Sequence, residues 1–266
     1  MAVATRTSAV PPWLDALLRD RGIQVASMVG LLAIWELFSF LVGEFAGTSI
    51  MPGPIDVAPR FFRLVASGEF IGPLLETLGR TGLGFLVAFV LGMAIGIASA
   101  KVIVVKAATG LTMNILLFAP TLVVIYLGTA MVGVGNITVA AVAGLLVAPN
   151  VSIYMRDVLS DFDPDLTAMA DSYRVPTRQR VVDVYLPYLV PSMLAASRVA
   201  FSQAWKIVML MEVFGQPGGL GYEIRSSYYI YDLQRMLSFL IVFVVALLVV
   251  EQGIRIAEHR LVKWQK

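Results

Sequence analysis

The sequence contains no cysteine, and its single histidine, His259, lies near the C-terminus. Without cysteine the chain has no disulfides, no thiolate metal ligands and no cysteine nucleophile. One histidine argues against a Ser-His triad or a histidine metal cage. The phosphate-binding motif Gly-x-x-x-x-Gly-Lys is also missing. We therefore expect no catalytic residue and no metal site, and the chain does not bind ATP through such a motif of its own.

Charged residues are scarce. They make up 14% of the 266 residues, whereas hydrophobic residues make up 58% and the mean hydropathy is +0.82. An ordinary soluble domain has about 25% charged residues. A water-soluble fold of this size could not bury so much apolar surface, so the excess must face a lipid bilayer. The net charge of +2 is too small to predict a nucleic-acid partner.

Long apolar runs predict an all-α membrane protein with about six transmembrane helices. A bilayer core of about 30 Å requires roughly 20 apolar residues per helix. In the second run, Ala88, Gly92, Gly96 and Ala100 recur every four positions, which makes a ridge where a neighbouring helix can approach closely. The candidate spans are residues 24–45, 80–100, 107–130, 136–156, 192–213 and 236–257.

Lysine and arginine residues near the spans predict the orientation in the membrane. Thirteen fall on the side of the N-terminus: Arg6, Arg19, Arg21, Lys101, Lys106, Arg156, Arg174, Arg178, Arg180, Arg255, Arg260, Lys263 and Lys266. Five fall on the other side: Arg60, Arg63, Arg80, Arg225 and Arg235. Positive residues favour the cytoplasmic side, so we expect a multi-pass protein of the plasma (inner) membrane with both termini cytoplasmic.

Three segments are expected along the chain. Residues 1–23 form a cytoplasmic N-terminal segment, in which an interfacial helix follows Pro11 and Pro12; a solvated tail is the alternative. Residues 24–258 form the transmembrane domain, and residues 259–266 a cytoplasmic tail. The first apolar run lacks a small-residue cleavage site and is long enough to span, so it does not fit a cleaved signal peptide.

Two connections are too long to be simple turns. The outer one, residues 46–79, is predicted to hold an amphipathic helix that ends at Ser67 and Gly68. The inner one, residues 157–191, is the most polar part of the chain. Within it, Asp163 suits a helix N-cap and Pro164 suits the first helical position. A helix of about ten residues can therefore start at this point.

A second short helix is predicted further along the inner connection. Pro176 biases the residue before it away from helix and breaks the first element. Thr177 can cap a second helix, which Pro187 and Pro191 would end before the fifth span. Two short helices joined by a sharp bend make a rigid knob that can dock into a groove of a cytoplasmic partner. An ordinary polar loop is the alternative.

A joint pattern of motifs surrounds this connection. Its parts are 166–174 (LTAMADSYR) with Pro187 after twelve further residues, 184–191 (VYLPYLVP), 204–215 (AWKIVMLMEVFG) and 218–222 (GGLGY). This pattern resembles the EAA loop and its flanks in the permeases of ABC importers. The nitrate/sulfonate/taurine/bicarbonate branch is most similar, because Trp35-Glu36 in the first span and Pro52, Pro54 and 67–69 (SGE) also match it. The resemblance covers roughly residues 30–255.

The resemblance implies a type I ABC importer permease fold with cytoplasmic coupling helices. It implies a transport subunit that is not itself an enzyme and has no cofactor of its own. A homodimer would dock two cytoplasmic ABC ATPase subunits that bind ATP-Mg. An extracytoplasmic solute-binding protein would deliver a small solute, expected to be anionic. The ATPase-coupling residues carried over are Leu166, Ala168, Met169, Ala170, Asp171, Tyr173, Arg174, Arg178 and Pro187.

The chain departs from the family pattern at the bend. The family has Glu-Ala-Ala where this chain has Ala168-Met169-Ala170, and glycine where it has Arg174. Glycine takes positive φ freely, whereas another residue loses roughly 1–2 kcal/mol there. Arg174 is therefore strained, or the bend has another geometry.

Five charged residues fall within the predicted spans, where charge is costly and usually faces protein or water. They are Glu36, Arg198, Lys206, Glu212 and Glu251. Arg198 and Glu251 lie nearer the inner edge and can extend to water. Lys206 and Glu212 are six residues apart, roughly 120° around the helix, so a direct ion pair between them is not expected.

Lys206 is the main candidate for the translocation path, where it would attract an anion. Neutralising Glu36 or a charge on another helix is the alternative. Glu212, Trp205 and Met209 complete the candidate path residues, although packing roles are common for such tryptophan and methionine residues.

Two other functions compete with the importer permease. An ion-coupled secondary carrier would use Glu36, Glu212 and Glu251 as proton sites. An intramembrane enzyme is disfavoured because the chain lacks a histidine pair and a clear nucleophile with its base. The paired helices of the inner connection favour the permease, since a carrier does not need them.

Overall fold

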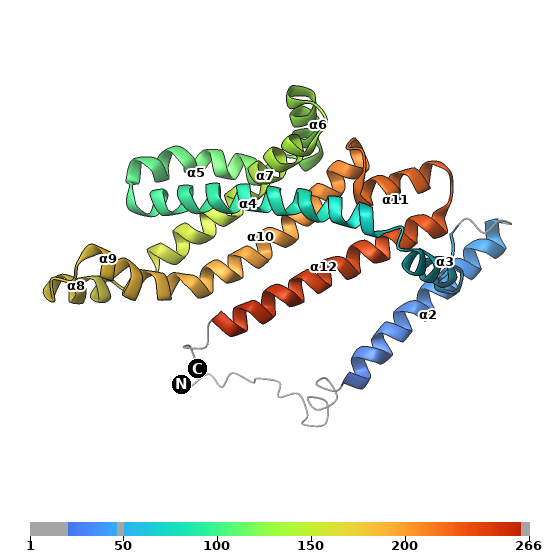
Figure 1. Ribbon diagram of the computed structural model, residues 1–266, viewed down its shortest axis with the longest axis horizontal. Helices are drawn as coiled ribbons and strands as arrows, with labels where there is room; N and C mark the ends of the chain where they lie inside the picture. The colour runs from blue at the N-terminus through green and yellow to red at the C-terminus, as the bar shows by residue number, and fades with distance from the viewer. Residues whose placement is uncertain (1–20, 47–50, 262–266) are drawn as a thin grey trace, which may run out of the picture.

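The computed structural model describes residues 21–46 and 51–261, and every regular element in these ranges is a helix (Figure 1). The elements are α2 (Arg21–Ala46), α3 (Pro54–Ser67), α4 (Ile71–Lys101), α5 (Ile103–Phe118), α6 (Thr121–Val132), α7 (Asn136–Ser160), α8 (Pro164–Ser172), α9 (Thr177–Gln179), the π-helix η1 (Arg180–Tyr185), α10 (Leu186–Phe214), α11 (Gly219–Tyr229) and α12 (Leu233–Leu261). The all-α prediction is confirmed. The interfacial helix predicted after Pro11 and Pro12 lies outside the described residues.

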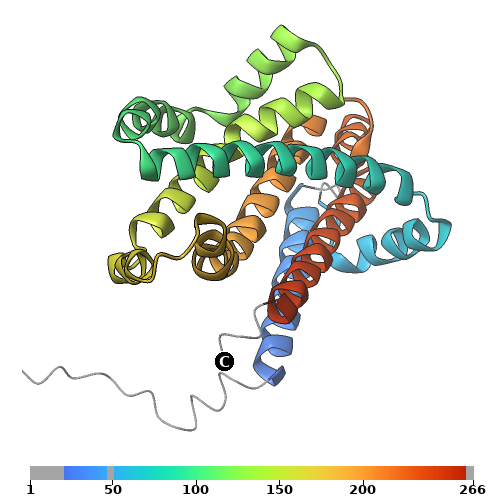
Figure 2. The same cartoon turned by 60° about the vertical axis from the view of Figure 1, so that its left-hand side comes forward.

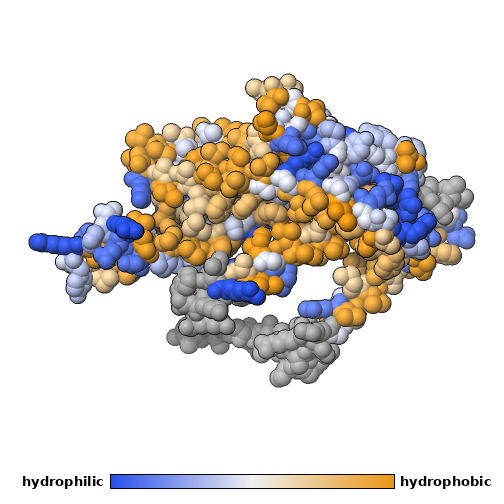
Figure 3. Space-filling model, in the orientation of Figure 1, coloured by the Kyte–Doolittle hydropathy of each residue, from blue (hydrophilic) through white to orange (hydrophobic). Residues whose placement is uncertain are grey.

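The long helices give the molecule two distinct ends. Within residues 21–46 and 51–261, five segments are long and apolar enough to cross a membrane: α2, α4, α7, the run from α9 to α10, and α12. In Figure 1, α8 and α9 lie at one end of these helices and α3 and α11 at the other; we name them the α8 end and the α3 end. Hydrophobic residues dominate the surface between the ends, and hydrophilic residues gather at both ends (Figure 3). This is the surface of a multi-pass membrane protein.

The small-residue ridge of α4 packs against α7. Ala88, Gly92 and Gly96 are buried. A Cβ atom added to Gly92 would lie 2.7 Å from the backbone oxygen of Ala148, and one added to Gly96 would lie 2.6 Å from that of Ser152. Larger side chains would force the two helices apart, which explains the spacing of small residues.

The predicted third span, residues 107–130, is not one straight helix. It is split into α5 and α6, whose axes meet at 103°. Pro120 has no backbone N–H and biases Ala119 to an extended conformation, with φ −62° and ψ 133°. As a result α6 turns sharply out of the direction of α5 (Figures 1 and 2), and its Ile125 is buried against Val139 and Val142 of α7. Only when taken together are the two halves long and apolar enough to cross a membrane.

The second span begins earlier than predicted. α4 starts at Ile71 rather than at residue 80. The sequence predicts Arg80 as the outer end of this span, whereas in the structure it lies inside α4 with only 8% of its surface exposed. A buried carboxylate neutralises Arg80 there, as described below.

The fifth span also begins earlier than predicted. Pro187 and Pro191 do not end the preceding short helix, because η1 continues directly into α10. The N–H of Leu186 donates to the oxygen of Val181, five residues back. This wider π-helical turn gives room to the ring of Pro187, which would clash with a carbonyl in a regular α-helix.

Helix α2 stands apart from the bundle. None of its apolar window is buried against the rest of the described chain. In Figure 1 it joins the molecule at the α3 end, where it packs against α3. The predicted amphipathic helix is α3, and it ends as expected, with Gly68 at φ 70° directly after Ser67.

Candidate functional site

The α8 end begins with the helix cap that the sequence predicts. The side chain of Asp163 accepts a hydrogen bond of 2.8 Å from the backbone N–H of Asp165. Pro164 occupies the first turn, where no backbone N–H is needed. The negative charge of Asp165 also lies in the first turn, close to the positive end of the helix dipole. The start of α8 is therefore fixed locally.

The bend after α8 places Arg174 in the left-handed conformation, with φ 51°. The N–H of Val175 donates to the oxygen of Ala170 at 2.9 Å, and the N–H of Arg174 donates to the oxygen of Asp171 at 3.0 Å. These two bonds form a Schellman motif, whose left-handed position usually holds glycine. Of the two alternatives left open by the sequence, strain at Arg174 is the one that the structure has.

We predict that Arg174→Gly stabilises the α8 end. Glycine removes the steric conflict of a left-handed residue, which costs about 1–2 kcal/mol, although its freedom in the unfolded chain offsets part of this gain. The expected net effect is about 0.5–1 kcal/mol, seen as slower hydrogen–deuterium exchange of residues 166–176. Arg178→Gly, four residues after Arg174 and on α9, should have the opposite effect. Faster exchange in Arg174→Gly would contradict the strain.

The second short helix is built differently from the prediction. Pro176 occupies the N-cap position of α9, and Thr177 is its first helical residue rather than its cap. An ion pair of 2.6 Å between Arg180 and Asp171 joins η1, which follows α9 directly, to α8. Phe162 packs on Tyr185 with ring centroids 4.9 Å apart. These contacts hold α8, α9 and η1 together as one unit, which we name the α8–η1 unit.

The predicted coupling residues lie close together on the α8–η1 unit, but they differ in exposure. Tyr173 is 79% exposed and Met169 is 49% exposed. Ala170 is buried and helps to hold the bend. The exposed residues of the set are Ala168, Met169, Asp171, Tyr173, Arg174 and Arg178, whereas Leu166 and Pro187 are half-buried. Met169 and Tyr173 therefore form an exposed apolar surface on this otherwise polar unit.

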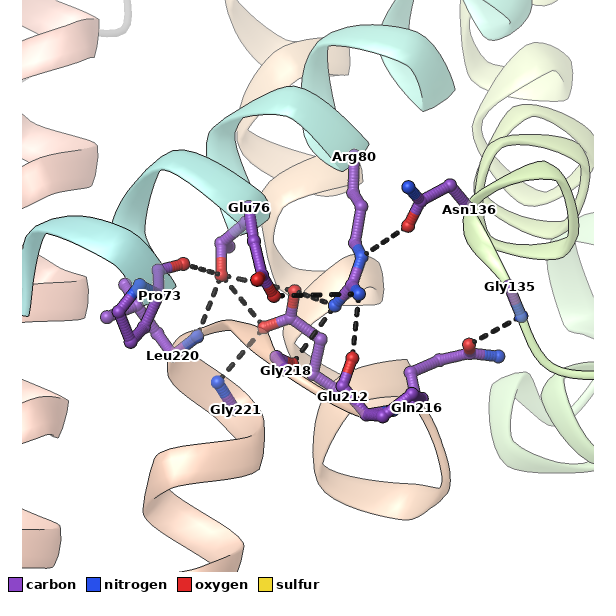
Figure 4. A network of polar contacts seen from close by, with 12 residues as sticks. Pro73, Glu76, Arg80, Gly135, Asn136, Glu212, Gln216, Gly218, Leu220 and Gly221 are labelled. Carbon is purple, nitrogen blue, oxygen red and sulfur yellow. Dashed lines mark hydrogen bonds and ion pairs between the residues drawn. The ribbon is translucent and has the colours of Figure 1, made fainter.

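A buried polar network lies at the opposite side of the bundle, between α4, α10 and α11 (Figure 4). Glu212 is fully buried, and its carboxylate lies 2.9 Å from a terminal nitrogen of the Arg80 guanidinium. Arg80 also donates to the side-chain oxygen of Asn136 at 2.8 Å and to the backbone oxygens of Pro217 and Gly218 at 2.7 and 3.0 Å. A buried charge is tolerated when it is paired and hydrogen-bonded in this way.

The same network holds the N-terminus of α11. The hydroxyl of Thr77 donates to Glu212 at 2.9 Å and accepts from the N–H of Leu220 at 2.9 Å. The carboxylate of Glu212 accepts from the N–H of Gly221 at 3.0 Å. Glu212 therefore neutralises the positive end of the α11 dipole as well as Arg80. Because α11 follows α10 after four residues, this network fixes the geometry of a broken helix.

Glu36, another predicted intramembrane charge, has a similar role at α3. Its carboxylate accepts a hydrogen bond of 3.1 Å from the N–H of Ile55 in the first turn of α3. Ser39, one turn further along α2, donates to the backbone oxygen of Met51. These bonds join α2 to α3, so Glu36 is not the partner of Lys206.

The four candidate path residues do not share one surface. Lys206 lies on the exposed face of α10 and forms no ion pair with the described residues. Trp205 is fully buried and stacks on Phe243, with centroids 5.2 Å apart. Glu212 is fully buried in the network above, and Met209 is half-buried. Only Lys206 presents its charge to the outside of the single chain.

The remaining predicted charges lie towards the α8 end. Arg198 forms an ion pair of 3.4 Å with Glu258 on α12. Glu251 is half-buried. Among residues 21–46 and 51–261, no cluster of three metal-ligating side chains occurs, and we propose no metal site.

The chain is similar to permeases of characterised transport systems. It is 26% identical to the putative aliphatic sulfonates transport permease protein SsuC of Bacillus subtilis, over 88% of this chain and 84% of SsuC. It is 22% identical to the nitrate import permease protein NrtB of Synechococcus elongatus, over 74% of this chain and 73% of NrtB. It is 20% identical to the taurine transport system permease protein TauC of Escherichia coli, over 95% of this chain and 93% of TauC.

Solved structures confirm the fold. An inward-facing structure of the MetNI methionine ABC transporter superposes with a TM-score of 0.60 at 20% identity, over 71% of this chain and 92% of that chain. An amino acid ABC transporter crystallised with histidines gives a TM-score of 0.62 at 19% identity, over 75% and 98% of the two chains. Residues 81–263 match the family described as binding-protein-dependent transport system inner membrane component. The chain belongs to this family.

Proposed function

We propose that this permease works as a homodimer that docks two ATPase subunits and takes a small anion from an external binding protein. The observation that carries the proposal is the α8–η1 unit. It presents Tyr173 and Met169 to solvent on a framework held by an ion pair, a Schellman motif and aromatic packing. A rigid unit can transmit the movement of a partner to α10, because η1 continues into that helix without a break.

The α8 end is proposed to face the cytoplasm, with both chain termini on that side. The excess of lysine and arginine at this end supports the orientation. The chain has no phosphate-binding loop of its own, so the ATP must be bound by the docked subunits.

A second copy is proposed to complete the translocation path. In the single chain, α2 is unburied along its apolar window and Lys206 is exposed in the middle of a span. An unpaired ammonium facing lipid would be costly. If the exposed face of α10 lines a path between two copies, Lys206 meets water instead.

The proposed substrate is a small oxyanion or organic anion. The relatives SsuC, NrtB and TauC are named for aliphatic sulfonates, nitrate and taurine, all of which carry an anionic group. A cationic side chain on the path favours anions over cations by direct Coulomb attraction. Lys206 is the residue that we propose for this role.

The direct test is uptake by proteoliposomes that contain this chain, its ATPase and its binding protein. We expect uptake of a sulfonate or nitrate only when ATP is present in the compartment that holds the ATPase. Loss of uptake without the binding protein is also expected. Uptake driven by a proton gradient without ATP would overturn the proposal in favour of the secondary carrier.

We predict that Lys206→Ala lowers the uptake of an anionic substrate by about tenfold or more, because loss of one nearby charge removes at least about 1.4 kcal/mol of attraction. The homodimer and the bound ATPase should persist, since Lys206 forms no ion pair with the described residues. Lys206→Arg should keep most of the uptake. Lys101→Ala, which removes an exposed lysine at the end of α4, is the matched control. Normal uptake in Lys206→Ala would remove this residue from the path.

A further inference from the structure

A cavity of about 270 Å³ lies between α7 and α10, which pack against each other. Val199 of α10 lines this cavity and is 53% exposed. It precedes Lys206 by seven residues, which is close to two helical turns or about 10 Å along the helix axis. The cavity therefore lies on the same face of α10 as the residue that we propose for the translocation path.

Two polar side chains of α7 line the cavity in the middle of a span. Asn150 lies about 21 Å from the first residue of α7 and about 15 Å from the last. Tyr154 follows one turn later on the same face and is 40% exposed. Neither the amide of Asn150 nor the hydroxyl of Tyr154 has a hydrogen-bond partner among residues 21–46 and 51–261. At this depth lipid supplies no hydrogen bonds, so both groups need a polar partner that the described chain does not provide.

Arg198 adds a third donor group to the cavity lining. One of its terminal nitrogens lies 3.4 Å from the carboxylate of Glu258, and this ion pair balances its charge. A guanidinium group has five N–H donors, so donors remain beyond the one that faces Glu258. Attraction of an anion from a distance therefore comes from Lys206, whereas the cavity supplies hydrogen bonds at close range.

The rest of the lining that α10 contributes is apolar and consists of small side chains: Ala195, Ala196, Val199 and Ala200. An apolar wall with a few polar groups is typical of sites that hold a small organic molecule in one orientation. A short alkyl chain would remove this wall from water, which is favourable. An inorganic ion such as nitrate has no apolar part and would leave the wall in contact with water.

We propose that this cavity binds a small organic oxyanion with a short alkyl chain. The alkyl chain lies against the alanine residues of α10, and the charged oxygens accept hydrogen bonds from Asn150, Tyr154 and Arg198. The inference rests on the proposed function and narrows it, because the substrate then carries an aliphatic part and is not an inorganic anion. Lys206 and the cavity are two successive positions for the same anion along one face of α10.

The first test measures binding to the purified full-length chain in a neutral detergent, without ATP or a partner. Butanesulfonate should raise the melting temperature, whereas nitrate at the same ionic strength should not. Tyr154→Phe removes only a hydroxyl and should require roughly tenfold more butanesulfonate for the same rise, because one hydrogen bond to a charged group is lost. Tyr229→Phe, at an exposed tyrosine of α11, is the matched control and should titrate as the wild type does.

The second test compares the uptake of two sulfonates in the proteoliposomes described above. Ala195→Leu should lower the uptake of butanesulfonate by about tenfold, because the added side chain occupies the space of the alkyl chain. Uptake of methanesulfonate, which has a single methyl group, should stay near the wild-type level. Ala94→Leu, at an exposed alanine of α4, is the matched control and should change neither uptake.

Three results would overturn this inference: an equal rise in melting temperature with nitrate, equal titrations of the wild type and Tyr154→Phe, or equal losses of both sulfonates in folded Ala195→Leu. If a second copy fills the cavity instead, butanesulfonate will not stabilise the wild type, and the inference is also wrong. The Tyr154→Phe titration decides alone if Ala195→Leu does not fold. A wild type that binds butanesulfonate in this way but shows no ATP-driven uptake would contradict the proposed function and not the site.

Discussion

Glu212→Ala is expected to lower the free energy of unfolding by about 3–5 kcal/mol, since it leaves a buried charge without its partner. Glu212 has no exposed surface and Arg80 has only 8%. The substitution would remove the ion pair of 2.9 Å and also the acceptor of the Gly221 N–H. The loss can be measured as a fall in melting temperature, or as the fraction of monodisperse protein after extraction in detergent.

Glu76→Ala is the matched control for this experiment. Glu76 lies 3.8 Å from the same guanidinium, but its side chain is 54% exposed. Removal of the Glu76 carboxylate should lower the free energy of unfolding by less than about 1 kcal/mol, as for other exposed ion pairs. The double variant Arg80→Met with Glu212→Met removes both charges and should be more stable than Glu212→Ala. If Glu212→Ala were no less stable than Glu76→Ala, the buried network would not stabilise the fold.

Local signals in the sequence predicted local structure well. The cap of α8 at Asp163, the break at Pro176 and the end of α3 at Gly68 are each set by one or two residues. In each case the cause is a side-chain acceptor, a missing N–H or a residue without Cβ, and these act within a few positions along the chain. The small residues of α4 were also predictive, because close helix packing requires them.

Pairing across the sequence could not be predicted in the same way. Arg80 and Glu212 are 132 residues apart, and Arg80 alone resembles the positive flank of a span. The burial of Arg80 is seen only in the structure. There α4 starts at Ile71, and Arg80 lies well within this helix with 8% of its surface exposed. The start of α10 was missed because a π-helical turn accommodates Pro187, and no local rule in the sequence signals that turn.

Two of the three carboxylates considered as proton sites of a carrier, Glu36 and Glu212, have a simpler explanation. Glu36 accepts from the first turn of α3, and Glu212 accepts from the first turn of α11. Both helices begin where the chain reverses or breaks, and their first N–H groups have no acceptor within their own helix. In a low-dielectric environment these groups need a partner. A glutamate on a neighbouring helix supplies the acceptor and the compensating charge together.

Replacing Met169 and Tyr173 together with aspartate is expected to weaken ATPase binding at least about a hundredfold. Loss of a large contact residue at the centre of an interface weakens the binding free energy by about 2 kcal/mol or more, and this variant changes two such residues. The α8–η1 unit itself should remain folded, because the side chain of Tyr173 is 79% exposed and neither residue takes part in the Asp171–Arg180 ion pair. Co-purification of the ATPase with the tagged permease measures the effect.

Tyr231→Asp gives the matched control, since Tyr231 is 86% exposed and lies next to the start of α12 at the α3 end. It also has a left-handed backbone, φ 57°, which aspartate tolerates better than tyrosine does. This variant should retain the ATPase in full. If Tyr231→Asp lost the ATPase as completely as the double variant does, the loss would follow from the removal of any exposed aromatic side chain. It would then not indicate docking at the α8 end. Full retention by the double variant would contradict docking at Met169 and Tyr173 and would place the ATPase on a different surface.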